Sequence, residues 1–212
     1  GKILRSPHAH AKIKSIDTSK AMALPGVLAV VTSADFAQPS GKITDLGEGA
    51  MANPKWISNN IMAAEKVLYK GHAVAAVAAI NSEVAEQATA LIEVDYEVLP
   101  AVTDVLEAMK PDAPILHERL ANSTNANIRP GGLRDEDDTE KATNISNHFV
   151  FELGDADAGF KKADIIVERE YRTATVHQGY IEPHTATAMW GEDGKLTVWA
   201  SSQGHFQIRD LT

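Results

Sequence analysis

The stretch VLYKGHAVAAVAAINSEVAEQATALIEVDYEVLPAV, from Val67 to Val102, decides the fold of the first part of this 212-residue chain. Its residues 73–80 form a continuous run of small apolar side chains, which is typical of a strand covered on both faces. Asn81 can cap a helix, and Glu83 places negative charge where the helix dipole favours it. Apolar residues then alternate with acidic ones over 92–98, which predicts a strand with one wet face. The stretch therefore predicts a strand, a helix and a strand in succession.

Shorter elements are expected before this stretch. Pro25-Gly26 marks a turn. We expect two short strands at residues 2–4 and 11–16 and a buried strand at 27–31. A helical turn at 33–36 and a long surface loop at 38–56 should follow. Together with the central stretch, they predict a fold of class α+β, in which a first domain spans residues 1–110.

The remainder of the chain divides into a linker and a second unit. Residues 111–147 contain an Asn-rich stretch, a glycine pair and a cluster of charges, which predicts an extended linker. The second unit, 148–212, is expected to hold a short helix at 159–163, a long strand that starts at Ile165, and a β-hairpin over 185–200. Because this unit would leave strand edges open and be marginal alone, we expect the chain to associate with itself or with a partner.

The composition argues against several classes of function. A net charge of −9 disfavours non-specific nucleic-acid binding, which needs a basic surface. We find no apolar run near the roughly 20 residues of a membrane span and no signal peptide, so we expect a cytoplasmic location. Since the chain has no cysteine, it can form no disulfide, thiolate zinc site or thiolate-bound iron–sulfur cluster. No glycine-rich nucleotide-binding motif is present either.

Two clusters of histidines are candidate sites. His8 and His10, two residues apart, could bind zinc from one face of a strand, but no third ligand has a recognisable spacing, so hydrogen bonding at a strand entry is the favoured interpretation. In the segment HQGYIEPH, 177–184, the carboxylate of Glu182 lies between two histidines and could act as a general base or support a cofactor. Spacing alone favours a buried structural carboxylate instead.

A third candidate is SSQGH, residues 201–205, which follows the last strand of the hairpin. Glycine permits the close approach of a ligand, and Gln203 offers both a hydrogen-bond donor and an acceptor. A capped turn into a helix that starts at Phe206 explains the same residues equally well. The residues alone leave both interpretations open.

Taken in order, these segments resemble the large subunit of the molybdenum hydroxylases, the family of xanthine dehydrogenase, aldehyde oxidase, carbon monoxide dehydrogenase and 4-hydroxybenzoyl-CoA reductase. The resemblance extends over the chain except for 38–60 and 118–146. It rests on LRSPHAHA at 4–11, PGV at 25–27, TSAD at 32–35, VxYxGxxVAxVA at 67–78, the passage 85–102, GD at 154–155, the His177 to Pro183 segment, and SQ at 202–203.

The resemblance implies an α/β-hammerhead domain followed by the first strands of a molybdopterin-binding domain. It implies that His177, Glu182 and Gln203 shape the vicinity of the cofactor. In the complete enzyme it implies molybdopterin, oxygen supplied by water, and iron–sulfur and FAD centres on partner subunits. The family's Gly-rich cofactor segment and its catalytic glutamate are missing from the sequence, so we expect no catalytic residue, no stoichiometric molybdenum and no activity in this chain alone.

Two other functions remain as alternatives. The first is a non-catalytic hammerhead-type module that acts as a scaffold or binds a partner. The second, much less favoured, is a metal-binding protein built on His8 and His10.

Overall fold

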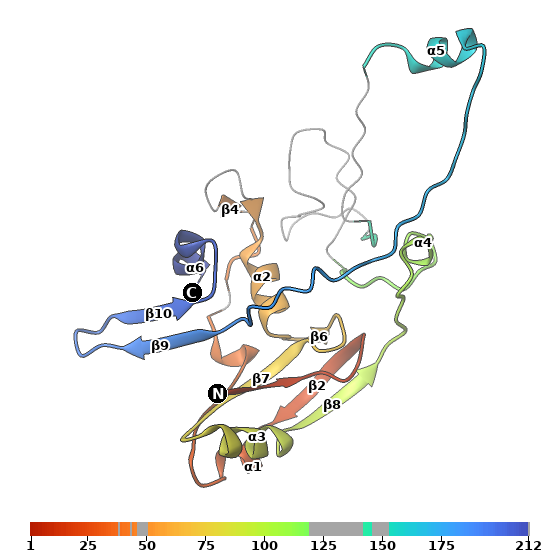
Figure 1. Cartoon of the computed structure of the whole chain (residues 1–212). Helices are drawn as coiled ribbons and strands as arrows, with labels where there is room; N and C mark the ends of the chain where they lie inside the picture. Colours follow the sequence, from red (N-terminus) through yellow and green to blue (C-terminus); the bar gives the residue numbers. More distant parts are fainter. Residues whose placement is uncertain (38, 43, 46–50, 119–141, 146–152, 212) are drawn as a thin grey trace. The chain divides into compact units, whose positions relative to one another are not determined.

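The computed structural model describes residues 1–37, 39–42, 44–45, 51–118, 142–145 and 153–211 (Figure 1). The chain divides into two units, residues 1–149 and 150–212, and each is described by itself. No helix in the described part of the chain has the length and apolar character that a membrane span needs.

Two antiparallel three-stranded sheets build the first unit. One has the order β1 (Lys2–Arg5), β7 (Ala73–Ala79), β3 (Val27–Thr32), and the other has the order β6 (Lys66–Val67), β2 (Ala11–Asp17), β8 (Glu93–Val98). The predicted strands at both ends of the central stretch are confirmed as β7 and β8, which belong to different sheets. The helix between them, α3 (Ser82–Ala90), therefore carries the chain from one sheet to the other (Figure 1).

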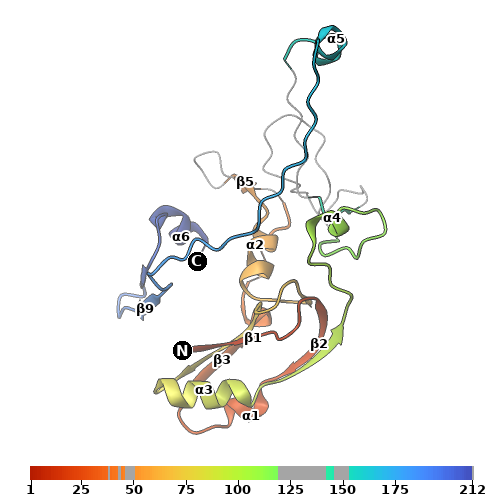
Figure 2. The same ribbon diagram turned by 45° about the vertical axis from the view of Figure 1, so that its right-hand side comes forward.

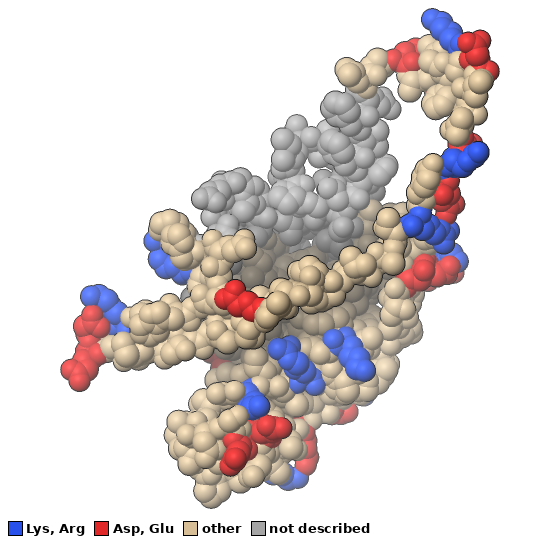
Figure 3. All heavy atoms as spheres, in the orientation of Figure 1, with Lys and Arg blue, Asp and Glu red and all other residues tan. Residues whose placement is uncertain are grey.

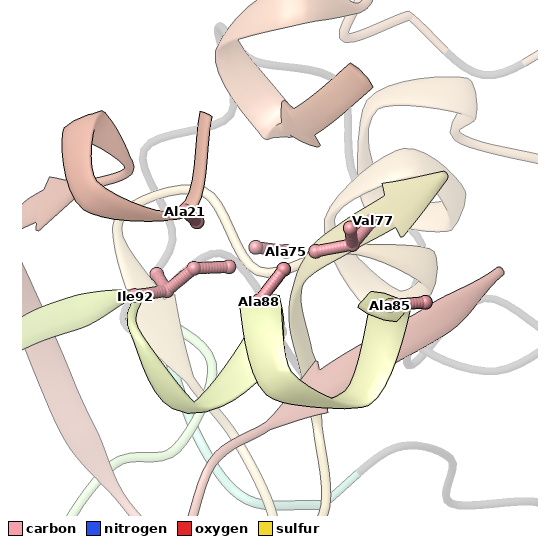
Figure 4. Packing of buried hydrophobic residues seen from close by; sticks show 6 residues of the cluster. All are labelled: Ala21, Ala75, Val77, Ala85, Ala88 and Ile92. Carbon is pink, nitrogen blue, oxygen red and sulfur yellow. The ribbon is translucent and has the colours of Figure 1, made fainter. Parts of the chain in front are cut away.

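Small side chains form the core between α3 and the first sheet. Ala85 and Ala88 of α3 are fully buried with Ala75 and Val77 of β7, and Ala21 of the short helix α1 (Ser19–Met22) completes the contact (Figure 4). Because alanine projects only a methyl group, the helix can lie close to the strand. Both helices cover the same side of the unit (Figure 2).

Strand β7 also contributes to a second core cluster. Val74 packs there with Ala11, Ala63 and Val67, all fully buried. Because Val74 and its neighbour Ala75 belong to different clusters, β7 is buried on both faces, as its uninterrupted apolar sequence predicts.

The turns and caps around these strands follow local sequence signals. The Asn81 side chain accepts a hydrogen bond from the Val84 N–H at 2.8 Å, which confirms the predicted cap of α3. Gly26 has a φ of 93°, and its carbonyl accepts a hydrogen bond from the Ile80 N–H at 2.9 Å. The predicted turn at Pro25-Gly26, just before β3, is therefore hydrogen-bonded to the residue that follows β7. The predicted helical turn is a 3-10 helix, η1 (Ser33–Asp35).

The predicted surface loop over 38–56 is wrong at its end. Helix α2 (Pro54–Ile61) begins there, preceded by the short strands β4 (Thr44–Asp45) and β5 (Met51–Ala52). Asn53, almost fully buried, caps α2 by accepting a hydrogen bond from the Lys55 N–H at 3.1 Å and donates to the Gly41 carbonyl at 2.6 Å. One asparagine therefore starts the helix and anchors the loop before it.

Asn144 fastens the end of the first unit, after the short helix α4 (Val105–Ala108). Its side-chain oxygen accepts from the Leu116 N–H at 3.0 Å, and its Nδ2 donates to the carbonyls of Ala108 at 3.0 Å and Pro114 at 2.9 Å. The predicted linker over 111–147 falls largely outside the described residues and stays a prediction.

The second unit contains a helix, a hairpin and a further helix. The predicted short helix is α5 (Ala156–Lys162), and the predicted hairpin consists of β9 (Ala186–Trp190) and β10 (Leu196–Ala200), followed by α6 (His205–Leu211). The long strand predicted from Ile165 is wrong, because no strand forms between α5 and β9. A strand needs a neighbour for its backbone hydrogen bonds, and no strand among the described residues pairs with this segment.

Candidate functional site

The base of the β9–β10 hairpin brings two of the predicted site segments to one place. Beyond the last paired strand residues, the Ser201 N–H donates to the Thr185 carbonyl at 3.0 Å, and the Thr185 N–H donates to Ser201 Oγ at 2.9 Å. The chain therefore enters and leaves the hairpin beside this residue pair, at the open end of the hairpin. Glu182 precedes it by three residues and Gln203 follows it by two, so both side chains start from the same end of the hairpin.

The turn that carries Gln203 is capped as one of the two interpretations predicts. Ser202 Oγ accepts a hydrogen bond from the Gly204 N–H at 3.1 Å, and the Gly204 carbonyl accepts from the Ile208 N–H at 3.0 Å. Helix α6 begins at His205, one residue before the predicted start. Gln203 itself is exposed. The cap uses the serine and leaves the amide of Gln203 at the surface. A capped turn and a ligand-binding role for Gln203 are therefore compatible.

The segment before the hairpin contains a row of rings. His177 lies 5.1 Å from Tyr180, and Tyr180 meets His184 edge-on at 5.2 Å, measured between ring centroids. The Gly179 N–H donates to Nδ1 of His177 at 2.9 Å, so the neutral imidazole carries its proton on Nε2. Glu182, between Tyr180 and His184 in sequence, is exposed rather than buried.

The three predicted site residues do not contact one another. Among the described residues, no hydrogen bond joins His177, Glu182 and Gln203, although the hairpin brings the last two segments to the same end. They provide an imidazole N–H donor, a carboxylate acceptor and an amide that both donates and accepts. Such a set suits a polar organic ligand with several hydrogen-bonding groups. The described residues contain no group of three or more His, Cys, Asp or Glu placed to hold a metal ion.

The histidine pair of the first unit serves packing and hydrogen bonding. His10 is 5% exposed, and its Nδ1 donates to the Pro100 carbonyl at 2.7 Å. His8 meets the ring of Tyr96 edge-on, with 5.0 Å between the centroids. These contacts match the favoured interpretation of the pair as hydrogen-bonding residues near a strand entry.

Sequence reasoning missed a pocket of about 350 Å³ in the first unit. Its walls come from α2, the start of β6 and the segment 116–118, and they include a ring stack and an ion pair. Trp56 and His117 stack with 5.1 Å between their centroids and 11° between their planes, and Lys66 Nζ lies 2.5 Å from Glu118 Oε1. No spacing rule could find this pocket, because its residues come from three separate parts of the chain.

Charges on the described residues are mixed in sign. On the face shown in Figure 3, basic and acidic side chains are interspersed, and the described residues form no broad basic surface there.

Two family models match the chain, one after the other. Residues 1–100 match the model described as the aldehyde oxidase and xanthine dehydrogenase a/b hammerhead domain, and residues 137–212 match the molybdopterin cofactor-binding domain. The first match agrees with the two-sheet unit, and the second includes the hairpin and all three predicted site residues.

Individual relatives give the same result. The chain is 37% identical over 216 residues to the carbon monoxide dehydrogenase large chain of Afipia carboxidovorans, a match that covers 100% of this chain and 24% of the relative. It is 35% identical over 229 residues to the probable hypoxanthine oxidase of Escherichia coli K12, covering 98% of this chain and 23% of the relative. The chain thus spans about a quarter of the length of these relatives.

Solved structures are similar over nearly the whole chain. The Cu,Mo-CO dehydrogenase structure in the carbon monoxide reduced state has a TM-score of 0.70 at 35% identity, over 99% of this chain and 25% of that one. Quinoline 2-oxidoreductase from Pseudomonas putida 86 has a TM-score of 0.68 at 29% identity, over 95% of this chain and 23% of that one.

Proposed function

Because the chain belongs to the aldehyde oxidase and xanthine dehydrogenase family of molybdopterin-dependent oxidoreductases, we propose that it contributes the hammerhead domain and the first part of the cofactor-binding domain to the large subunit of such an enzyme. The observation that carries this proposal is the order of the two family matches along one chain. The non-catalytic scaffold is the competing function, and the experiment below separates the two.

In this proposal the open end of the hairpin faces the molybdenum cofactor. When bound, the cofactor supplies the redox chemistry by which a carbon centre is oxidised with oxygen from water. The amide of Gln203 would hold a polar edge of the cofactor as donor and acceptor, and Nε2 of His177 would donate a hydrogen bond. The carboxylate of Glu182 would accept a hydrogen bond from the cofactor and orient the hydrogen-bond donors around the cofactor. These three residues position the cofactor, and none of them acts on the substrate.

The partners of the complete enzyme are part of the same proposal. Because these 212 residues contain no cysteine, they cannot ligate an iron–sulfur cluster, and in this proposal electrons leave through iron–sulfur and flavin centres outside them, on partner subunits. The remainder of the large subunit would cover the second unit. We also propose a cytoplasmic location, which is supported by a cysteine-free composition that needs no oxidising compartment.

The test replaces the matched quarter of the Afipia carboxidovorans large chain with this sequence and measures molybdenum per purified chimera. We expect near-stoichiometric molybdenum, reduced by Glu182→Ala and Gln203→Ala but not by the matched substitutions Glu192→Ala and Gln87→Ala at exposed positions outside the site. A folded chimera without molybdenum would favour the scaffold. If molybdenum is retained in every variant, the family role stands and the assignment of site residues is wrong.

A further inference from the structure

Residues Leu116, His117 and Glu118, which we call the clasp, are held against the first unit by two side-chain contacts, and the Leu116 N–H also donates to the Asn144 side chain at 3.0 Å. The ring of His117 stacks on Trp56 of α2, and the carboxylate of Glu118 pairs with Lys66 of β6 at 2.5 Å. The Lys66 side chain is 11% exposed and the Glu118 side chain is 70% exposed, so only the lysine of this ion pair is buried. After the clasp, the next described residues of the first unit are 142–145.

The surroundings of His117 oppose a positive charge on its ring. Burial is the main cause that lowers the pKa of His117 below the ordinary 6.5, and Lys66 acts in the same direction, as do His10 and His72. Glu118 alone favours the proton. The other charged groups on the pocket wall are Lys55 of α2 and Glu65 beside β6.

Of the two interior histidines, His72 has its ring proton on Nε2 and offers no acceptor, whereas His10, which donates from Nδ1, has an acceptor at Nε2 that makes no hydrogen bond to His117. His72 is fully buried and His10 nearly so, and the Nε2 of each has no hydrogen-bond partner among the described residues. Nδ1 of His72 accepts a hydrogen bond from the Leu68 N–H at 3.2 Å, and Nδ1 of His10 donates one to the Pro100 carbonyl. Nδ1 of each ring is therefore already hydrogen-bonded.

We propose that the clasp is a pH-sensitive fastener: neutral His117 keeps Leu116–Glu118 on α2, and protonation of His117 releases the segment while the rest of the first unit stays folded. In the released state the imidazole regains water and its ordinary affinity for a proton. The contribution of His117 is therefore complete above pH 6.5 and is lost as the pH falls from there through the lowered pKa of the closed form. Acidification thus frees the clasp, whether or not the chain serves a molybdenum enzyme.

Glu118 titrates in a different range. Burial is the largest single influence and raises its pKa, but the hydrogen bond from Lys66, the backbone of Glu118 and the charges of Lys66 and His10 together leave the pKa below the ordinary 4.5. Its contribution is present above pH 4.5 and lost only below, so Glu118 does not take part in release near pH 6. A Glu118→Gln substitution should loosen the clasp at every pH between 7.5 and 5, and because the Glu118 charge favours the proton on His117, it should also move the plateau of release to lower pH.

The absence of cysteine permits a direct test in the full chain. We would introduce Leu116→Cys as the probe and Ala90→Cys, exposed on α3, as the reference, and follow the ratio of their thiol-labelling rates from pH 7.5 to 5. Both thiols share the intrinsic pH dependence of the reaction, so the ratio reports opening. We expect it to rise about tenfold per pH unit below 6.5, up to a plateau at the pKa of the closed form.

Substitutions decide whether His117 is the cause. His117→Gln should make the ratio independent of pH, whereas His8→Gln, a partly buried histidine against another aromatic ring, should leave the rise intact. Ala88→Cys in the core reports global unfolding and should stay unlabelled throughout. A flat ratio in the parent chain, the same rise in His117→Gln, or parallel labelling of Ala88→Cys would each overturn the proposal.

Discussion

At the scale of single residues, volume decides where α3 can lie. Ala85 and Ala88 are fully buried against β7, and interiors of this kind are packed as densely as organic crystals. The sequence predicted a helix after the cap at Asn81. It could not predict the partner across the interface, since Ala75 and Ala21 come from other segments.

Enlarging one of these alanines should destabilise the first unit. Ala88→Leu adds three carbons where Ala75 and Val77 leave no room, and we expect the free energy of unfolding to fall by about 1–3 kcal/mol. Urea unfolding followed by circular dichroism measures this, with Ala90→Leu on the exposed face as the matched control. Equal effects of both substitutions would mean that α3 does not pack as described.

The buried histidine His72 gives the first unit a pH dependence of its own. Burial is the main cause that lowers its pKa below 6.5, while the nearby backbone of Asn59 and Asn60 favours the proton without forming a hydrogen bond. The unfolded chain therefore binds protons more readily, and stability present above pH 6.5 is lost as the pH falls through the lowered pKa.

We therefore expect the free energy of unfolding to be lower at pH 5.5 than at pH 7.5. One histidine contributes at most about 1.4 kcal/mol per pH unit in this window, and His117 adds to the same trend. Carboxylates with lowered pKa, such as Glu118 and Asp17, lose their contribution only at more acidic pH. Guanidinium unfolding at the two pH values checks this, and equal or greater stability at pH 5.5 would contradict it.

At the scale of elements, signals carried within one segment were predictable and those between segments were not. The cap at Asn81 and the hairpin around Gly194 follow from local sequence. Helix α2 was missed although Asn53-Pro54 is a common helix start, because the Gly- and Asn-rich sequence before it indicated a loop. The strand expected from Ile165 had the right residue types, but no strand among the described residues pairs with it. The hairpin was found, yet the hydroxyl of Ser201 that closes its base was not.

Removing the cap of α3 should have a measurable cost. Asn81→Ala leaves the Val84 N–H without the side-chain acceptor that it has at 2.8 Å, and such losses lower stability by about 1 kcal/mol. Ser82→Ala at the first helical position is the matched control and should have little effect. Thermal unfolding of both variants separates them, and equal melting temperatures would show that water replaces the cap.

At the scale of the whole molecule, the two units differ in how well they bury their apolar residues. The first has two core clusters, whereas the second leaves Ile181 98% exposed, Trp190 72% and Trp199 54%. Large aromatic side chains are seldom left in water by a stable domain without a partner. The two family matches explain this contrast: the first covers a domain with its own core, and the second covers part of a domain in much longer relatives.

We therefore expect the isolated chain to self-associate through its second unit. Its average mass in light scattering should rise with concentration from the low micromolar range, and a hydrophobic dye should bind. Trp190→Ser together with Trp199→Ser should reduce both effects, while Trp56→Phe in the first unit should not. If the chain stays monomeric and binds no dye at all concentrations, the second unit buries these side chains by itself.

The side chain of Asn144 has a consequence for how the protein is made. It satisfies the Leu116 N–H, a residue 28 positions earlier, as well as two carbonyls on the same stretch. A ribosome adds roughly 5–20 residues per second, so those backbone groups wait on the order of 1–7 s for their partner to be synthesised. During that interval the segment from Ala108 to Leu116 lacks the side chain that satisfies its backbone, so the end of the first unit can form only after Asn144 has been added. Slow codons between these positions would lengthen that delay without altering a single amino acid.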